Sequence, residues 1–248
     1  MEIRAAGPGQ DPVSVTVTMR TPGSDFELAA GFLHTEGLVR SREDIHSIRY
    51  CELPPEQQNY NVVTVRLSCP FQMDGEARHF YATSSCGICG KASLEAIQLQ
   101  CRRLPRGPEG ALTSTVISSL PERLRKSQRI FDETGGLHAG GLFDMDGTTR
   151  AIREDVGRHN AVDKLVGWAL LAGKVPLHQQ VLTVSGRISF EIVQKAAVAG
   201  IPVICAVSAP SSLAVEAAQE FGMTIVGFVR GESFNVYTCP ERVGFDGS

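Results

Sequence analysis

The second half of the chain alternates short apolar strands with amphipathic helices, and this rhythm constrains the fold more than any other feature. Residues 180–184, 202–207 and 224–229 have the character of strands, and residues 190–199 and 213–221 that of helices. Strand–helix–strand units at this spacing close as right-handed crossovers on a parallel sheet. We therefore expect an α/β fold with a largely parallel sheet, and a last strand at 234–238 beside it.

Four further segments extend this α/β region toward the N-terminus. We expect a helix at 113–132 that tolerates Pro121, short strands at 137–143 and 150–153, and a helix at 160–171. The first of these segments follows a stretch at 104–110 that is rich in proline and glycine, which is typical of a domain boundary.

The first half of the chain is richer in strand-like sequence. Residues 13–19 and 61–67 alternate with the period of a half-buried strand. Ser24 or Asp25 is placed to cap a helix at 26–35. The predicted organisation is a small β-rich N-terminal domain over residues 1–108 and a larger α/β domain over residues 109–248.

Composition limits the classes of function. The chain has 248 residues, of which 42% are hydrophobic and 21% charged, as expected for a globular protein of one or two domains. Seven cysteines without a secretory apolar segment indicate free thiols and a cytoplasmic location. No apolar run approaches the ~20 residues that cross a bilayer. A formal net charge of −3 argues against a general nucleic-acid binder, so local arginines and helix starts would have to hold any anion.

Cys86 and Cys89 form the one Cys-x-x-Cys motif of the sequence. The motif lies in a Ser- and Gly-rich loop between a strand-like run at 78–83 and a helix-like run at 91–102. A thiol just before a helix meets free N–H groups and the positive end of the helix dipole, which favour the thiolate. We therefore expect sulfur chemistry at this pair.

Three alternatives to sulfur transfer remain open for this pair. Inert packing suits a polar loop poorly. Structural zinc would need a second pair of ligands, which the isolated remaining cysteines do not supply, so no metal site is expected. A dithiol–disulfide oxidoreductase would place the motif within a thioredoxin-like strand–helix–strand pattern, which is missing here.

Polar turns follow two of the predicted parallel strands. The turn at 185–189 contains Arg187, and the turn at 208–212 contains Ser208 and Ser211. Hydroxyl and N–H groups at a helix start are the arrangement that holds phosphate, and an arginine adds bidentate hydrogen bonding. The alternative is that these serines only cap helices. Together, the two turns predict an anion site at the end of the sheet.

Other polar clusters are candidates for the same site. Arg158 and His159 belong to a charged cluster at 153–160 that runs into a helix, and His138 follows two glycines. The alternative is a helix cap with solvated charges. Arg230 lies on a turn between two strands, which is either an ordinary hairpin or a flap carrying a cation. The chain contains neither a P-loop nor a Gly-x-Ser-x-Gly elbow, and it does not match the signature of the zinc deaminases.

These motifs, taken in order, resemble one family closely: the sulfur carrier proteins needed for formate dehydrogenase activity, the FdhD family. The resemblance covers residues 2–238, nearly the whole chain. The segments that carry it are 19–23, 31–37, 84–91, 134–138, 153–164, 185–191 and 207–214. The chain begins almost at its first family-like segment, so we expect either that an upstream segment is dispensable or that the start site is misplaced.

The resemblance implies a specific activity. Proteins of this family accept sulfur from a cysteine desulfurase as a persulfide and pass it to the molybdenum of bis(molybdopterin guanine dinucleotide), for apo formate dehydrogenase. By motif match, Cys86 carries the persulfide and Cys89 assists its transfer. A turn matches the family segment associated with cofactor binding; its residues are Phe228, Val229, Arg230, Gly231, Glu232 and Ser233.

The resemblance also implies a homodimer, and a larger domain that is similar to the cytidine deaminase fold. A chaperone that holds the same cofactor without sulfur chemistry is the alternative function. Substituting Cys86 by alanine would distinguish the two, because a chaperone of this kind does not need the thiol.

Overall fold

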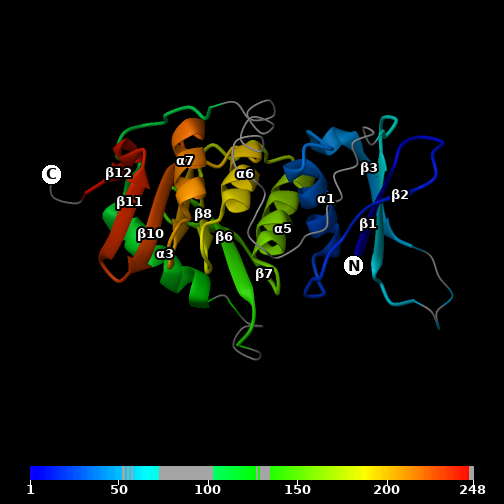
Figure 1. The fold of residues 1–248 in the computed structure, drawn as a ribbon, viewed down its shortest axis with the longest axis horizontal. Coiled ribbons are helices and arrows are strands. Elements are labelled where there is room, and N and C mark those ends of the chain that lie inside the picture. Colours follow the sequence, from blue (N-terminus) through cyan, green and yellow to red (C-terminus); the bar gives the residue numbers. More distant parts are fainter. Residues whose placement is uncertain are drawn as a thin grey trace.

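In the described part of the chain, a pair of packed helices, α1 (Asp25–Thr35) and α5 (Arg158–Leu171), separates a four-stranded sheet from a six-stranded sheet (Figure 1). The computed structural model describes residues 1–51, 54, 56, 58–72, 103–126, 128 and 135–245. None of the helices within these ranges is both long and apolar enough to cross a membrane.

The smaller sheet is formed by the N-terminal part of the chain and has the strand order β2-β1-β4-β3. Its strands are β1 (Glu2–Ala6), β2 (Val13–Val17), β3 (Ile45–Tyr50) and β4 (Val62–Leu67). Strands β1 and β4 are parallel, and the other two pairs are antiparallel. Alternate residues of β4 are buried in one core with the apolar face of α1, which therefore covers one face of the sheet. The predicted β-rich N-terminal part is confirmed, although β1 and β3 were not predicted.

The larger sheet has six strands in the order β11-β10-β9-β8-β6-β7. These are β6 (His138–Asp144), β7 (Thr149–Asp155), β8 (Gln180–Val184), β9 (Val203–Ala206), β10 (Thr224–Arg230) and β11 (Ser233–Thr238). Among the described strands of this sheet, only the pairs β8–β9 and β9–β10 are parallel. The prediction of a largely parallel sheet was therefore wrong. Short hairpins join β6 to β7 and β10 to β11, and a short connection permits only antiparallel pairing.

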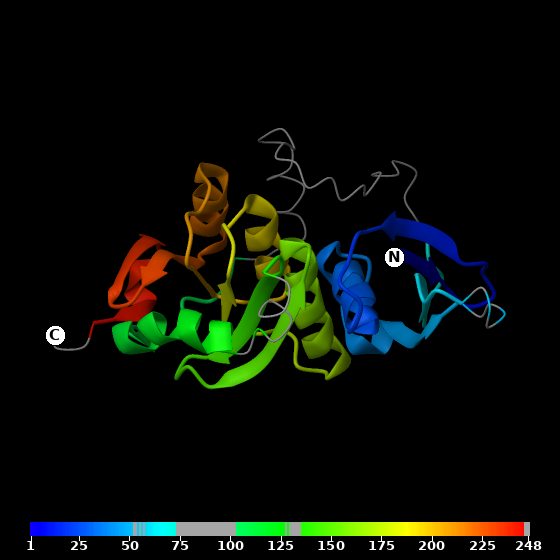
Figure 2. The same cartoon turned by 90° about the horizontal axis from the view of Figure 1, so that it is seen from below.

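Helices cover both faces of the larger sheet, as an α/β fold requires. Helix α3 (Ser114–Lys126) packs on one face with Val181, Val203 and Val226. On the other face, α5, α6 (Phe190–Val198) and α7 (Ser212–Phe221) pack with the alternate residues Leu182, Ile204 and Ile225. Figure 2 shows this sandwich from the side, with α3 on one side and α6 and α7 on the other.

The observed helices and strands differ from the predicted ones mainly in where they end. Helix α3 keeps Pro121 in its interior but ends at Lys126, so the predicted helix at 113–132 was too long. A two-stranded ladder joins β5 (Leu112–Thr113) to β12 (Val243–Gly244), and single 3-10 turns lie at Arg42–Asp44 and Pro240–Arg242. The α/β class of the fold is confirmed, whereas its likeness to cytidine deaminases and the boundary at residue 108 stay predictions.

Two glycines permit the close contact between α1 and α5. A Cβ atom on Gly31 would lie 1.8 Å from the carbonyl oxygen of Asp163, and one on Gly167 would lie 1.8 Å from that of Glu27. Beside this contact, the buried Lys195 ammonium donates to Asp163 Oδ1 and to Thr35 Oγ1, each at 2.9 Å. The N-terminal part is thus joined to the α/β part through a tight helix pair with a buried ion pair.

Candidate functional site

The carboxyl ends of three parallel strands, β8, β9 and β10, meet at one edge of the larger sheet. Backbone hydrogen bonds tie together the turns that follow them. Ile188 N–H donates to the carbonyl of Ala209 at 3.3 Å, and Ser211 N–H donates to that of Ile188 at 2.9 Å. Phe228 N–H in turn donates to the carbonyl of Ser208 at 3.3 Å. The three polar segments predicted from the sequence therefore form one continuous edge.

The first residue of β6 and the first turn of α5 complete this edge. Ser185 and Ala139 are joined by two hydrogen bonds, from Ala139 N–H to Ser185 Oγ at 2.9 Å and from Ser185 N–H to the carbonyl of Ala139 at 3.0 Å. A Cβ atom on Gly186 would lie 3.3 Å from His138 Nδ1 and 3.9 Å from Arg158 Cδ. His138 and Arg158 therefore both lie beside Gly186, where a side chain would crowd them.

His159 lies beside the start of α6. Its Nε2 atom is 3.2 Å from Ser189 Oγ and 3.9 Å from Glu191 Oε2. Burial, with the nearby charges of Arg158 and Lys195, lowers the pKa of His159 to about 4. Burial and then Arg158 lower the pKa of His138 as well. Both imidazoles are accordingly neutral at pH 7, and that of His159 forms a hydrogen bond with Ser189 rather than an ion pair.

The carboxyl group of Glu191 is the acid nearest to these imidazoles. Burial opposes its ionisation, but hydrogen bonds from Ser189 and from its own backbone N–H, together with nearby positive charge, lower its pKa. Glu191 is therefore a carboxylate at neutral pH. It offsets part of the positive charge that the arginines bring to the edge.

The side chain of Arg158 has an unsatisfied hydrogen-bond donor at this edge. Its side-chain Nε is buried and has no hydrogen-bond partner among the described residues. A buried donor without a partner costs about 1–3 kcal/mol, so it is a place where a bound acceptor would be stabilised. Arg187, on the adjoining turn, is exposed to solvent. The edge can thus offer two guanidinium groups to an anion.

The serines of the two turns have different roles. Ser211 Oγ accepts a hydrogen bond from Ala214 N–H at 3.2 Å and caps α7, as the alternative interpretation predicted. Its hydroxyl proton can still be donated to a ligand. Ser189 also precedes a helix, but its side chain makes no cap and faces His159 instead. Ser208 is half-buried between the ends of β9 and β10.

The predicted cofactor turn is the β10–β11 hairpin. Arg230 pairs with Ser233 across it, and Gly231 takes the left-handed backbone conformation of the turn with φ of 55°. The side chains of Phe228, Arg230, Glu232 and Ser233 are exposed. The side chain of Val229 is 1% exposed and packs in the core on the α3 side, so it is not accessible to a ligand.

The charged cluster at 153–160 divides into structural and site residues. The guanidinium of Arg153 is bidentate with Glu27 of α1, at 2.7 Å from Nη2 to Oε1, and Lys164 Nζ lies 2.7 Å from Asp155 Oδ2. The first pair joins β7 to α1 of the N-terminal part, and the second joins α5 to the end of β7. Only Arg158 and His159 of the cluster contribute side chains to the edge.

The cysteine pair Cys86 and Cys89 lies outside the described residues. Among those that are described, Cys51, Cys69, Cys205 and Cys239 are free thiols. Burial raises the pKa of Cys205 to about 12, so this thiol is unreactive. The described part of the chain contains no cluster of three or more side chains suited to a metal ion.

Comparison with known proteins gives a consistent result. The sequence pattern of the FdhD/NarQ family matches residues 10–244. The chain is 53% identical to a sulfur carrier protein FdhD of Mycolicibacterium paratuberculosis, over 98% of this chain and 89% of that protein. It is 45% identical to a sulfur carrier protein FdhD of Sulfurisphaera tokodaii, over 94% of this chain and 86% of that one.

One solved structure has the same fold. It is described as a formate dehydrogenase accessory protein from Desulfotalea psychrophila. The two structures superpose with a TM-score of 0.72 at 27% sequence identity, over 98% of this chain and 89% of the other.

Proposed function

The chain belongs to the FdhD/NarQ family, and from this premise we propose that it is a sulfur carrier acting in the maturation of formate dehydrogenase. In this proposal Cys86 accepts sulfur from a cysteine desulfurase, and bis(molybdopterin guanine dinucleotide) is the substrate that receives it. The protein acts as a cytoplasmic homodimer and serves apo formate dehydrogenase. Support comes from the sulfur carrier name shared by relatives about half identical to this chain, and from the Cys-x-x-Cys motif.

The two cysteines suffice for a balanced transfer. In loading, the Cys86 thiolate attacks the terminal sulfur of the desulfurase persulfide, and the desulfurase cysteine leaves as a thiolate. In delivery, Cys89 attacks the inner sulfur of the Cys86 persulfide. The terminal sulfur then departs as hydrosulfide, with the electron pair of the broken S–S bond and the Cys89 proton. A Cys86–Cys89 disulfide remains, which a thiol reductant returns to the dithiol.

The edge of the six-stranded sheet is the proposed place for the nucleotide ends of the substrate. The single observation that carries this assignment is the buried Arg158 Nε without a partner, beside the glycine of the 185–189 turn. Arg158 and Arg187 would bind phosphate oxygens, and neutral His159 would donate or accept one hydrogen bond. The hairpin at 228–233 would close over the same ligand with Arg230, Ser208 and Ser211 beside it.

The sulfur step is tested by mass spectrometry after incubation with a cysteine desulfurase and cysteine. We expect one or more sulfur atoms on Cys86 that a reductant removes, and none there in Cys86→Ala. Cys69→Ala, which removes an exposed free thiol, is the matched control and should load normally. A Cys86→Ala variant that still supports formate dehydrogenase maturation would establish the chaperone function instead.

Nucleotide binding at the edge of the six-stranded sheet is tested separately, with guanosine diphosphate as the probe. A hydrogen bond to a charged group contributes about 1.5–3 kcal/mol, so Arg158→Gln should weaken binding about tenfold or more. Arg40→Gln removes an exposed arginine from the N-terminal part and is the matched control. Equal affinities for the two variants would place the nucleotide elsewhere.

A further inference from the structure

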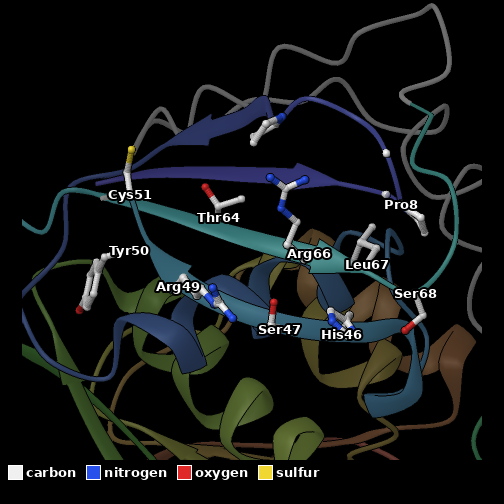
Figure 3. A pocket seen from close by; sticks show the side chains of 13 residues that line it. Pro8, His46, Ser47, Arg49, Tyr50, Cys51, Thr64, Arg66, Leu67 and Ser68 are labelled. Carbon is white, nitrogen blue, oxygen red and sulfur yellow. The ribbon is translucent and has the colours of Figure 1, made fainter. Parts of the chain in front are cut away.

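A cavity of about 760 Å³ opens on the face of the N-terminal sheet that α1 does not cover (Figure 3). Strands β3 and β4 form its floor, with Ser47 and Arg49 from the first and Thr64 and Arg66 from the second. The loop between β1 and β2 forms a wall, to which Pro8 belongs. Its volume lies within the range of about 300–1,000 Å³ that is typical of small-molecule sites.

The strand register brings two arginines together on this floor. Arg49 of β3 lies opposite Thr64 of β4, and Arg66 lies opposite Ser47. Arg49 and Arg66 are therefore diagonal neighbours on one face, about 7–8 Å apart at their backbones, within the combined reach of two long side chains. Val65, which lies between Thr64 and Arg66 on β4, points to the opposite face and is buried in one core with residues of α1.

An irregularity in β3 adds a third basic group. The register of β3 against β4 shifts between Ile45 and Ser47. This bulge leaves His46 exposed on the rim of the cavity rather than buried in the alternating pattern. Bulges re-aim side chains in this way at binding sites. The hydroxyl groups of Ser47, Thr64 and Ser68 lie among these side chains.

No carboxylate lies among the described residues that line the cavity. Glu2 of the neighbouring strand already pairs with Arg4 at 2.8 Å, and neither Asp11 of the β1–β2 loop nor Asp44 before β3 is among the lining residues. The cavity is therefore locally positive on a protein whose formal net charge is −3. Two arginines thus line one hollow that has no carboxylate among its described lining residues.

The wall of the cavity is fixed by one glutamine. Gln10 Oε1 accepts hydrogen bonds from Gly7 N–H at 2.8 Å and from Phe71 N–H at 2.7 Å, and its Nε2 donates to the carbonyl of Phe71 at 3.0 Å. Arg66 Nη1 donates to the carbonyl of Gln10 at 2.9 Å. Arg66 is thereby held in place while the rest of its guanidinium faces the hollow. A site organised in advance loses less entropy when a ligand binds.

We propose that this cavity binds a small polyanion bearing phosphate or carboxylate groups, held by Arg49, Arg66 and His46. This site is independent of the proposed nucleotide edge, because α1 and α5 lie between the N-terminal sheet and the six-stranded sheet (Figure 1). Guanidinium groups bind both oxyanions in a bidentate manner, and the adjacent hydroxyls supply further hydrogen bonds.

Isothermal titration calorimetry with tripolyphosphate and with citrate tests the proposal and distinguishes the two oxyanions. We expect one of them to bind, with affinity that falls as salt is added, and Arg49→Gln to weaken it about tenfold. Arg40→Gln, an exposed arginine of the same part of the chain, should leave binding unchanged. Amide NMR shifts on binding should concentrate at residues 46–49 and 64–68.

Three results would overturn the proposal. They are the absence of millimolar binding by either anion, equal weakening in Arg49→Gln and Arg40→Gln, and tighter binding of a glutamate oligomer than of either small anion. The last would identify a protein-docking surface instead. Loss of binding in Arg158→Gln with full binding in Arg49→Gln would also refute it, because the anion would then occupy the sheet edge.

Discussion

His159 should make the stability of the protein fall steeply in mild acid. Burial and the neighbouring Arg158 and Lys195 charges lower the pKa of this residue from 6.5 to about 4. The folded protein therefore binds this proton more weakly than the unfolded chain does, and protonation favours unfolding. The contribution is fully present above about pH 6.5 and is lost as the pH falls toward 4.

The size of the effect follows from the same shift. A lowering from 6.5 to about 4 corresponds to about 3 kcal/mol of stability that is lost between these limits. Glu191 opposes the shift, whereas Arg158, Lys195 and His138 reinforce it, so these are the charged and titratable groups that surround the imidazole. A loss of about 3 kcal/mol is a large fraction of the total stability of a typical domain.

Urea unfolding at several pH values between 7 and 4 measures this quantity. Other groups titrate in the same range, so the informative value is the difference in unfolding free energy between the wild type and His159→Gln. That difference should change by about 3 kcal/mol across the range, in favour of the variant at low pH. An NMR titration of the His159 ring should give a midpoint near 4. A difference that stays constant, or a midpoint near 6.5, would refute the reasoning.

Three further predictions concern the buried groups. Lys195→Met should lower the free energy of unfolding by about 3–5 kcal/mol, because it leaves the Asp163 carboxylate buried without its cation. In a double-mutant cycle, the double variant with Asp163→Asn should recover much of this loss. Additive losses would contradict it. Gly31→Ala should destabilise the protein by about 2 kcal/mol or more, since its Cβ would overlap the Asp163 carbonyl. Gly9→Ala should cost less in the same unfolding assay, because no atom lies near its Cβ and only the left-handed backbone, with φ of 71°, opposes the change. Cys205 should resist iodoacetamide under native conditions while exposed Cys69 reacts, as peptide mass spectrometry can show; rapid labelling of Cys205 would contradict its burial.

The sequence was most informative where periodicity was unbroken. The strand predicted at 180–184 coincides with β8, and the helix predicted at 213–221 begins one residue later than α7. Strand β3 was missed because the bulge at His46 interrupts the alternation of buried and exposed residues. The pairing of the strands could not be predicted either. Strand β6 pairs with β8, which does not follow it in the sequence, and the local sequence pattern does not specify that choice.

The site was predictable only in part, for a related reason. The polar residues of the turns after β8 and β9 can be recognised directly in the sequence, and parallel strands bring such turns to one edge. The cluster at 153–160 was ambiguous because charge alone does not say which residues pair. The structure assigns Arg153 and Asp155 to ion pairs with Glu27 and Lys164, and leaves Arg158 with a buried donor unpaired. His138 was a candidate in the sequence, but its position beside Gly186 depends on antiparallel pairing that the sequence did not predict.

The segment before α1 shows how the N-terminal part supports the site without belonging to it. Asn160 Nδ2 donates to the carbonyl of Met19 at 2.7 Å, and Lys164 Nζ donates to that of Thr21 at 2.9 Å. Thr21 N–H donates to Asp155 Oδ2 at 3.1 Å, and Val156 N–H donates to Thr21 Oγ1 at 3.0 Å. These bonds fix the chain on both sides of Arg158 and His159, so the first turn of α5 is held from outside its own sheet. The family-like motif at 19–23 therefore acts on the candidate site by positioning, and the tight contact at Gly31 and Gly167 keeps that support in register.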